Sequence, residues 1–170
     1  MTLDTGTLAS FNPAHDPDGF RGALGRFVTG VTVVTTDGPD GPVAIVANSF
    51  ASVSLDPPLV LWSPAKGSRR FDHFAHARRF AVHVLGADQR DLCAAIIASK
   101  TAIRQMPTRT SHCGVPLIEG ALATFECAHS ATHDAGDHVI VVGEVTRAHH
   151  GDGDPLVFHA GRYGRFHPED

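Results

Sequence analysis

Two long segments near the C-terminal end constrain the fold most strongly. Residues 121–133 read ALATFECAHSATH and residues 138–150 read HVIVVGEVTRAHH, and both have the composition of β-strands. The intervening residues 134–137 read DAGD, which suits a tight turn. The sequence therefore predicts a long antiparallel hairpin, and the short segment 155–161 is expected to extend it into a three-stranded meander.

Four shorter strands are predicted earlier in the chain. Residues 31–36 and 43–50 flank a turn rich in Gly, Pro and Asp, residues 59–62 follow two prolines, and residues 80–85 alternate in polarity. Six or more strands with few helices favour a closed or partly closed antiparallel barrel with helices at its margins, because long unprotected strand edges invite aggregation.

Three helices are predicted, over residues 16–30, 68–77 and 87–98. Asp16 suits the N-cap of the first helix, and Ser68 is expected to cap the second. The first helix is amphipathic, and its apolar face comprises Phe20, Leu24, Phe27 and Val28. The third is expected to bury Leu92, Ala95 and Ile96.

Residues 99–116 follow neither the helical nor the strand period and are interpreted as a long loop. Such a loop is uncommon in a compact domain unless it covers a site or an interface. We therefore expect this segment to cover one of the two.

Composition excludes several classes of protein. A chain of 170 residues with 42% hydrophobic and 19% charged residues is most simply one globular domain. A net charge of −4 gives no basic surface for nucleic acid, and no apolar run is long enough to cross a membrane. The N-terminus does not resemble a secretory signal, and the cysteines form no CxxC pair, so a cytoplasmic location with reduced thiols is expected.

Common catalytic and nucleotide-binding motifs are missing from the sequence. It contains no GxGxxG, GxxxxGK[ST] or GxSxG pattern, and Ser49 is not interpreted as a nucleophile. His133 and His138 would approach each other across the predicted hairpin, but no third ligand accompanies them, so no metal site is assigned. Glu126 and Glu144 are interpreted as single charges that pair with arginines.

The stretch VANSFASVSLDPPLVL, residues 46–61, places small polar residues between two apolar segments. Its hydroxyls, its amide and its backbone N–H groups could bind a phosphate or the edge of a heteroaromatic ring. An ordinary β-bulge or loop, in which Ser and Asn satisfy their own backbone, explains the same residues equally well.

The sequence resembles the short-chain flavin reductase family, whose members serve two-component monooxygenases. The two most specific matches are ANSFASVSLDPPLVL at residues 47–61 and GDHVIVVGEV at residues 136–145. Three further matches occur in the same order, at residues 27–36, 80–85 and 155–164. The resemblance implies an FMN-binding split β-barrel over residues 19–170, after an N-terminal extension of residues 1–18, and a homodimer with flavin sites near the subunit interface.

The resemblance also implies the site residues. The flavin-contacting residues comprise Asn48, Ser49, Phe50, Ala51, Ser52, Ser54, Lys66, Ser68, Arg69, Asp137 and Tyr163. His138 is implied beside the nicotinamide, as the catalytic residue. Where the family often has Gly and Thr before the Asn-Ser pair, this chain has Ala44 and Val46.

The function implied by the resemblance is NADH- or NADPH-dependent reduction of FMN or FAD, with the reduced flavin passed to a partner monooxygenase. Hydride transfer needs the two rings to stack, so positioning is the main contribution of the protein. Two alternatives remain open: a flavin-binding electron carrier or store without reductase activity, and a barrel related to pyridoxamine-phosphate oxidases that acts on a small substrate.

Overall fold

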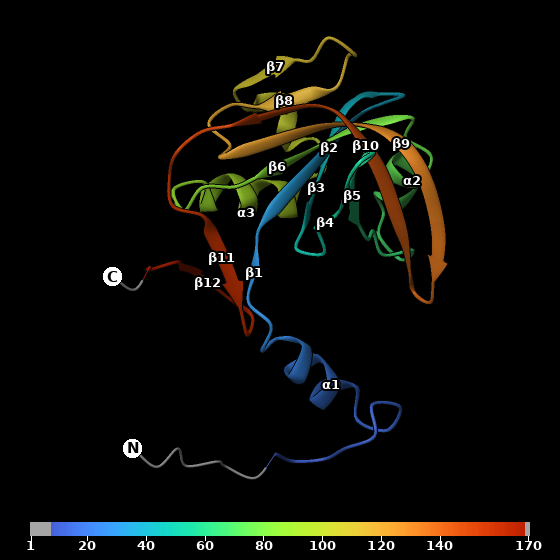
Figure 1. The fold of residues 1–170 in the computed structure, drawn as a ribbon, viewed down its shortest axis with the longest axis vertical. Coiled ribbons are helices and arrows are strands. Elements are labelled where there is room, and N and C mark those ends of the chain that lie inside the picture. Colours follow the sequence, from blue (N-terminus) through green and yellow to red (C-terminus); the bar gives the residue numbers. More distant parts are fainter. Residues whose placement is uncertain (1–7, 169–170) are drawn as a thin grey trace.

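Seven antiparallel strands form the main sheet of the protein (Figure 1). A computed structural model describes residues 8–168 of the chain. The strands of this sheet are β2 (Thr32–Gly38), β3 (Gly41–Ala47), β4 (Ala51–Leu55), β5 (Pro58–Trp62), β6 (Arg79–Val84), β9 (Ala123–Ala135) and β10 (His138–His150). Their order is β3-β2-β6-β9-β10-β5-β4, so β3 and β4 form the two edges. The predicted mainly β, antiparallel fold with few helices is confirmed.

The β9–β10 hairpin has the predicted position and turn. His138 pairs with Ala135 across a turn in which Gly136 has a φ of +69°, a conformation that glycine adopts without strain. Two register shifts bend the hairpin so that it follows the curvature of the sheet. Near the first shift, a Cβ on Gly143 would lie 2.5 Å from the Phe80 ring, so only glycine fits this close approach.

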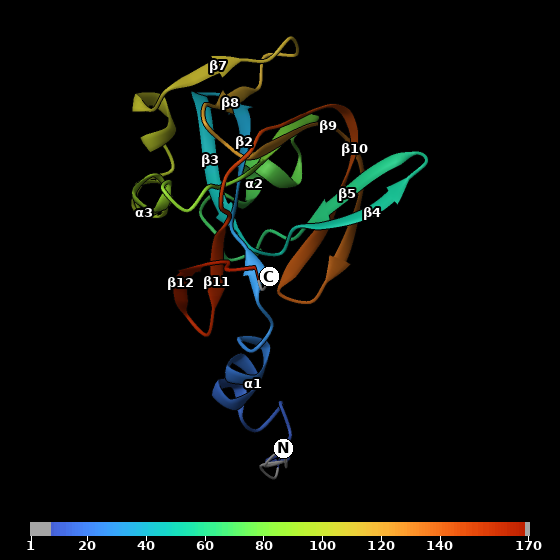
Figure 2. The same cartoon turned by 60° about the vertical axis from the view of Figure 1, so that its left-hand side comes forward.

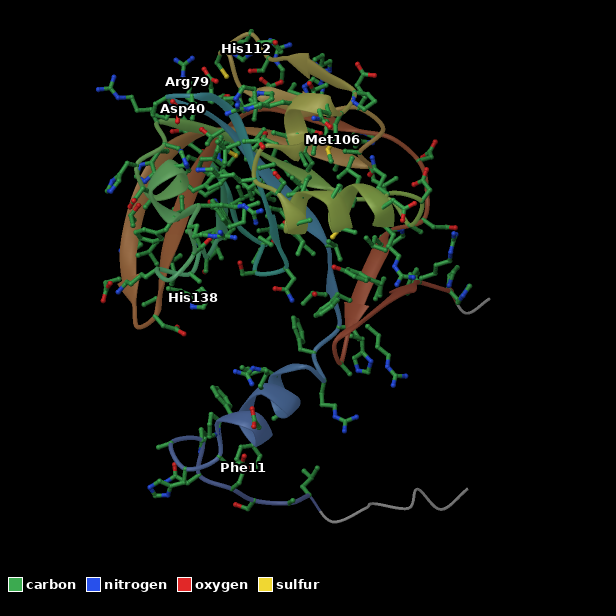
Figure 3. The ribbon with its side chains drawn as sticks, turned by 180° about the vertical axis from the view of Figure 1, so that it is seen from behind. Phe11, Asp40, Arg79, Met106, His112 and His138 are labelled. Atoms are coloured by element: carbon green, nitrogen blue, oxygen red, sulfur yellow. The ribbon has the colours of Figure 1, made fainter. Side chains whose placement is uncertain are left out.

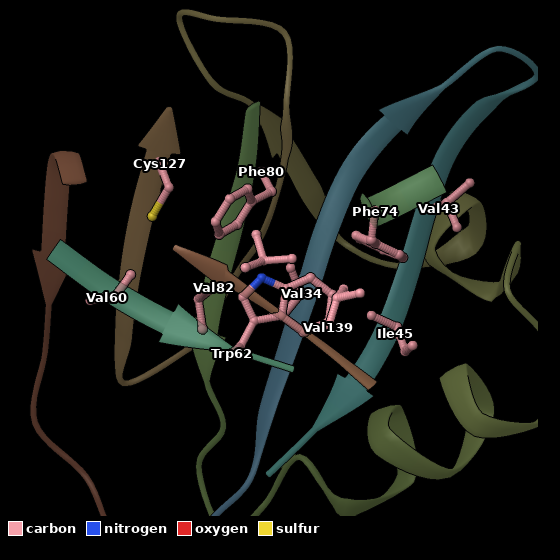
Figure 4. Packing of buried hydrophobic residues seen from close by; sticks show 11 residues of the cluster. Val34, Val43, Ile45, Val60, Trp62, Phe74, Phe80, Val82, Cys127 and Val139 are labelled. Carbon is pink, nitrogen blue, oxygen red and sulfur yellow. The ribbon is translucent and has the colours of Figure 1, made fainter. Parts of the chain in front are cut away.

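The hydrophobic core shows that the sheet curls around one centre (Figure 4). Val43 and Ile45 from edge strand β3 belong to the same buried cluster as Val60 and Trp62 from β5, near the opposite edge. The Trp62 ring packs edge-on against Phe74, with ring centroids 5.4 Å apart. No strand pairing within residues 8–168 joins β3 to β4, so closure into a barrel is not confirmed.

The meander predicted for the C-terminal third is wrong in its last strand. Strand β11 (Leu156–His159) leaves the main sheet and pairs with β1 (Thr29–Gly30) and β12 (Arg162–Arg165) in a separate three-stranded sheet. The connection at residues 151–155 redirects the chain, and the partner strand β1 lies far away in the sequence, where no local pattern announces it.

Residues 99–116 are not the unstructured loop that the sequence suggested. They contain the 3₁₀ helix η1 (Ala102–Gln105) and strand β7 (Thr108–Thr110), which pairs with β8 (Pro116–Ile118). Residues 99–118, called the cover below, lie over the outer face of the main sheet. There the Thr35 hydroxyl donates a hydrogen bond to the Pro116 carbonyl at 2.6 Å. The segment packs on a face of the main sheet, whereas the sequence had suggested that it covers a site or an interface, and that expectation stays a prediction.

The predicted helices are present with altered bounds. α1 (Pro17–Leu24) is capped by Asp16, whose carboxylate accepts from the Gly19 N–H at 2.8 Å. α2 (Phe71–Ala75) is shorter than predicted and Ser68 is not its N-cap residue, although the Ser68 hydroxyl accepts from the Arg70 N–H. α3 (Arg90–Ala98) buries Cys93 and Ile96, whereas Ala95 is exposed.

The apolar residues predicted for the first helix are not covered by the part of the chain that the structure describes, residues 8–168. The helix projects from the body of the protein (Figure 1), and it contains no buried residue. The exposed fractions are 44% for Phe20, 59% for Leu24, 77% for Phe27 and 54% for Val28. Because α1 ends at Leu24, Phe27 and Val28 follow the helix and do not belong to its face, so the predicted helix over residues 16–30 is wrong in its last part.

Residues 51–55 form a strand of their own, whereas the sequence had suggested only a break between two buried strands. The strand, β4, is mostly exposed and pairs with β5, with a register shift between Ser52 and Ser54. Figure 2 shows the β4–β5 hairpin extending away from the rest of the sheet. The β-bulge, which was one of the two interpretations of these serines, is thus present.

Across residues 8–168, no helix combines the length and the apolar character needed to cross a bilayer. Residues 1–7 and 169–170 lie outside the described part of the chain, so the interpretation of the extreme N-terminus is not tested.

Candidate functional site

A corner of the chain between β3 and β4 forms one wall of the candidate site. β3 ends at Ala47, and residues 48–50 turn the chain before β4 begins. The Ser49 hydroxyl accepts a hydrogen bond from the Ser63 N–H at 2.9 Å and donates to the Ser63 carbonyl at 3.3 Å. These two bonds fix the corner against the segment that follows β5.

The segment after β5 is fixed in turn by the β9–β10 turn. The Lys66 N–H donates to the Asp137 carbonyl at 2.9 Å, and the Val139 N–H donates to the Pro64 carbonyl at 3.2 Å. The Lys66 ammonium group contacts the Asp134 carboxylate and donates to the Gly136 carbonyl at 2.7 Å. These contacts place His138, at the start of β10, opposite the corner.

A hollow of about 320 Å³ lies between these segments, within the size range of small-molecule sites. Its lining residues are Ile45, Val46, Ala47, Asn48, Ser49, Trp62, Ser63, Pro64, Ala65, Ser68, Arg70 and His138. Most of these side chains are small, so a flat ring could approach the backbone closely.

A second hollow, of about 490 Å³, adjoins the first and is strongly basic. It shares Ser68 and Arg70 with the first hollow and adds Arg69 and Lys100. The Arg70 guanidinium donates to the Ile96 carbonyl at 2.6 Å, near the C-terminal end of α3. Burial, and secondarily Arg69, lower the pKa of Arg70. Three neighbouring cations without a carboxylate in the lining suit a phosphate group.

His138, labelled in Figure 3, lines the first hollow and forms a hydrogen bond with Asp137. The His138 Nδ1 atom lies 2.7 Å from the Asp137 carboxylate, and this hydrogen bond, followed by the charge of His138, lowers the pKa of Asp137. Because Nδ1 donates to a carboxylate, Nε2 is the ring nitrogen left for a ligand. The side chain of His138 is 42% exposed and can therefore be reached from solvent.

The structure brings together part of the predicted site. Asn48, Ser49, Ser68 and His138 line the first hollow, and Arg69 lines the second. Tyr163 lies with Asn48 on a third hollow of about 220 Å³, where its hydroxyl is 3.3 Å from the Cys93 sulfur.

The other predicted residues lie outside these hollows. Phe50 stacks on Phe125 with ring centroids 5.5 Å apart and packs against the hydrophobic core. Lys66 and Asp137 belong to the contacts that fix the β9–β10 turn. Ala51, Ser52 and Ser54 lie on strand β4.

Sequence reasoning missed several lining residues. Arg70 follows Arg69 in the same basic segment and could have been included on charge alone. Lys100 reaches the second hollow only because α3 ends there, and Trp62 was predicted only as the last residue of the strand at 59–62. No local pattern identifies the last two as site residues.

A small antiparallel β domain with a ring-sized hollow beside a basic one suits the binding of a nucleotide-like cofactor. The chain belongs to the family described as the flavin reductase like domain, whose family model matches residues 24–167.

Individual relatives agree with this family. The chain is 58% identical over 147 residues to the FMN reductase (NADH) SmoA of Agrobacterium fabrum, covering 86% of this chain and 84% of that protein. It is 40% identical to the reductase subunit HsaB of a flavin-dependent monooxygenase from Mycobacterium tuberculosis, covering 91% and 84%. The solved structure of the NADH:FAD oxidoreductase SgcE6 of Streptomyces globisporus superposes with a TM-score of 0.89 at 34% identity, covering 99% and 98%.

The residues present fit a flavin. The first hollow offers small side chains for the ring, and the adjoining basic hollow offers cations for the phosphate. Trp62, which lines the first hollow, has a buried indole N–H without an acceptor among the described residues. A buried donor in this state is costly unless a ligand or water accepts from it.

Proposed function

We propose that the protein is an NADH-dependent flavin reductase that supplies reduced flavin to a partner monooxygenase. The observation that carries the proposal is the junction of the ring-sized hollow at Asn48 and His138 with the basic hollow at Arg69. The names of SmoA and HsaB support the activity and the two-component arrangement. An electron carrier or flavin store without reductase activity is not favoured by these relatives.

A bound flavin would supply the hydride acceptor, and the contribution of the protein would be to position the flavin and the nicotinamide. In our proposal the corner at Asn48 and Ser49 holds the ring, and Ser68 and Arg69 hold the phosphate. His138 orients the nicotinamide donor through Nε2. The remaining residues implied by the resemblance act around this centre: Phe50, Ala51, Ser52 and Ser54 support the corner, Lys66 and Asp137 support His138, and Tyr163 borders Asn48.

The finer assignments belong to the same proposal. Relatives are named for FMN and for FAD, so both flavins are candidates, and NADH is favoured over NADPH by the relatives' names. We further propose that the curved sheet is a split barrel, which is supported by the core that β3 and β5 share. A cytoplasmic location suits reduced thiols, and all three cysteines are free.

The activity is tested by following NADH oxidation at saturating FMN and FAD. His138→Ala is expected to lower kcat/KM for NADH by about tenfold, because the variant loses one hydrogen bond between the His138 ring and a charged or polar group of NADH. His133→Ala, an exposed histidine on the same hairpin, serves as the control and should leave the rate unchanged. An unchanged rate for His138→Ala would remove His138 from the site, whereas a wild-type protein inactive with both flavins would refute the proposed function.

We also propose a homodimer in which the apolar residues of α1 and of the segment after it pack against a second copy. Phe27 follows the C-terminal end of α1 and is 77% exposed, so Phe27→Asp is expected to shift the protein from dimer to monomer. Sedimentation velocity measures the change. Arg21→Ala, an exposed change on the same helix, should leave the dimer intact. A wild-type protein that sediments as a monomer at every concentration would contradict the proposal.

A further inference from the structure

A cluster of metal-ligand side chains lies on the outer face of the main sheet, far from the flavin-site residues. Glu126 belongs to β9, and His112 and Cys113 lie in the connection between β7 and β8 that covers this face. Figure 3 shows His112 at one end of the main sheet and His138 toward its other end, on the side where α1 projects. Nothing in the proposed flavin reduction uses this cluster.

The three side chains converge closely. The His112 ring nitrogen, the Cys113 sulfur and a carboxylate oxygen of Glu126 all lie within 4.8 Å of one another. Ligand atoms around a tetrahedral Zn²⁺ lie roughly 3–4 Å apart, as bonds of about 2.0–2.3 Å dictate. His112 and Cys113 lie on an exposed connection beside Gly114, which has a φ of +86°, so a small adjustment of this loop would close the remaining difference.

The state of Glu126 is an independent sign that a ligand is required. Its side chain is only 2% exposed, and burying a carboxylate is costly unless its oxygens are bound. The Oε2 atom is fully buried and has no hydrogen-bond partner among the described residues. His112 Nδ1 lies 3.2 Å from it, yet in a geometry that makes no hydrogen bond. The ion pair with His112 thus leaves Oε2 without a hydrogen bond, so this oxygen remains available to a cation.

The other oxygen of Glu126 is held in position. The His149 Nε2 atom lies 2.8 Å from Glu126 Oε1, so a histidine outside the trio orients the carboxylate. Carboxylates that bind metals are commonly held by such outer hydrogen bonds. The expectation that Glu126 pairs with an arginine is therefore wrong, because two histidines are its partners.

We propose that His112, Cys113 and Glu126 bind a Zn²⁺ ion, with water in the fourth position. A nitrogen, a sulfur and an oxygen ligand suit zinc better than the hard cations, which prefer oxygen alone. The ion joins the β7–β8 connection to β9 and thereby fastens the cover formed by residues 99–118 to the sheet. Neither oxidation nor reduction is involved, and the thiol releases its proton when it binds the ion.

The test uses the full chain, freed of metal by a chelator and titrated with Zn²⁺ or with Co²⁺ as a spectroscopic probe. We expect one ion per chain and, with Co²⁺, the intense absorption of a thiolate-bound tetrahedral site. Cys113→Ser should abolish the thiolate band, and His112→Ala should weaken Zn²⁺ binding by at least about tenfold. A bound ion should also raise the melting temperature of the wild type.

His76→Ala is the matched control, since His76 is an exposed histidine away from the cluster. It should bind Zn²⁺ as the wild type does. His112 is itself exposed, so His112→Ala is expected to fold even if Cys113→Ser does not. Absence of stoichiometric binding, or binding unaffected by His112→Ala, would overturn the proposal. Neither readout depends on flavin, so its result is separate from that of the reductase assay.

Discussion

Asn48→Trp is expected to weaken flavin binding by about 100-fold, and the yellow holoprotein should not form. Asn48 is exposed at the β3–β4 corner and borders the first and the third hollow, so an indole there fills space that a ring needs. Forcing extra volume into such a site costs about 1–3 kcal/mol, and each 1.4 kcal/mol changes affinity about tenfold. Titration of the variant with FMN and FAD, followed by flavin fluorescence, measures the loss.

The control is Asp152→Trp, which adds the same side chain to the exposed connection between β10 and β11. It should bind flavin as the wild type does. Because Asn48 is exposed, the melting temperature of Asn48→Trp should stay close to that of the wild type, which separates a blocked site from a misfolded chain. Wild-type flavin affinity in Asn48→Trp would exclude this corner as the flavin site.

Local signals predicted the parts of the fold that depend on neighbouring residues. Asp16 caps α1, and Gly136 supplies the positive φ of the β9–β10 turn; both features depend on a short-range pattern that can be recognised in the sequence. Strand β11 was misassigned because its partner β1 is distant in sequence. The register of such a pair is decided by packing, which the alternation of a four-residue strand does not encode.

The candidate site was predictable to a similar extent. The resemblance supplied Asn48, Ser49, Ser68 and His138, which line one hollow. It also supplied Phe50, whose ring stacks on Phe125 and supports the corner from the core. Phe50 was included because it lies in the same segment as Asn48 and Ser49. Lys100 escaped notice since only the end of α3 brings it to Arg69.

Two buried polar side chains beneath the cover, His83 and Glu126, could not be predicted from the sequence. His83 and Glu126 alternate within strands whose other face is apolar, and a charged residue in such a strand is normally interpreted as exposed. The cover of residues 99–118 buries them, so their chemistry depends on a segment without a clear period. The burial of His83 affects the stability of the protein at low pH.

The stability of the protein is expected to fall by about 3 kcal/mol as the pH is lowered from 6.5 to 4, through His83 alone. His83 is fully buried, and this burial lowers its pKa to about 4, with a smaller lowering by Arg109; the Val33 carbonyl and Glu126 act in the opposite direction. Nδ1 lies 3.1 Å from the Val33 carbonyl and donates to it, while Nε2 has no partner among the described residues. Protonation would therefore place a charge where nothing accepts it.

The sign follows from proton uptake. Between pH 6.5 and 4 the unfolded chain binds a proton at His83 and the folded chain does not, so acid favours unfolding; the contribution is complete above pH 6.5 and is lost as the pH falls toward 4. Urea unfolding at several pH values, with a chelator present, measures it. Over this pH range the free energy of unfolding of His83→Gln should fall by about 3 kcal/mol less than that of the wild type. Glu126 and the histidines that contact it contribute equally to both proteins. If the free energy of unfolding fell equally with pH in the two proteins, His83 would be protonated in the folded state. Water would then have to reach the side chains around His83.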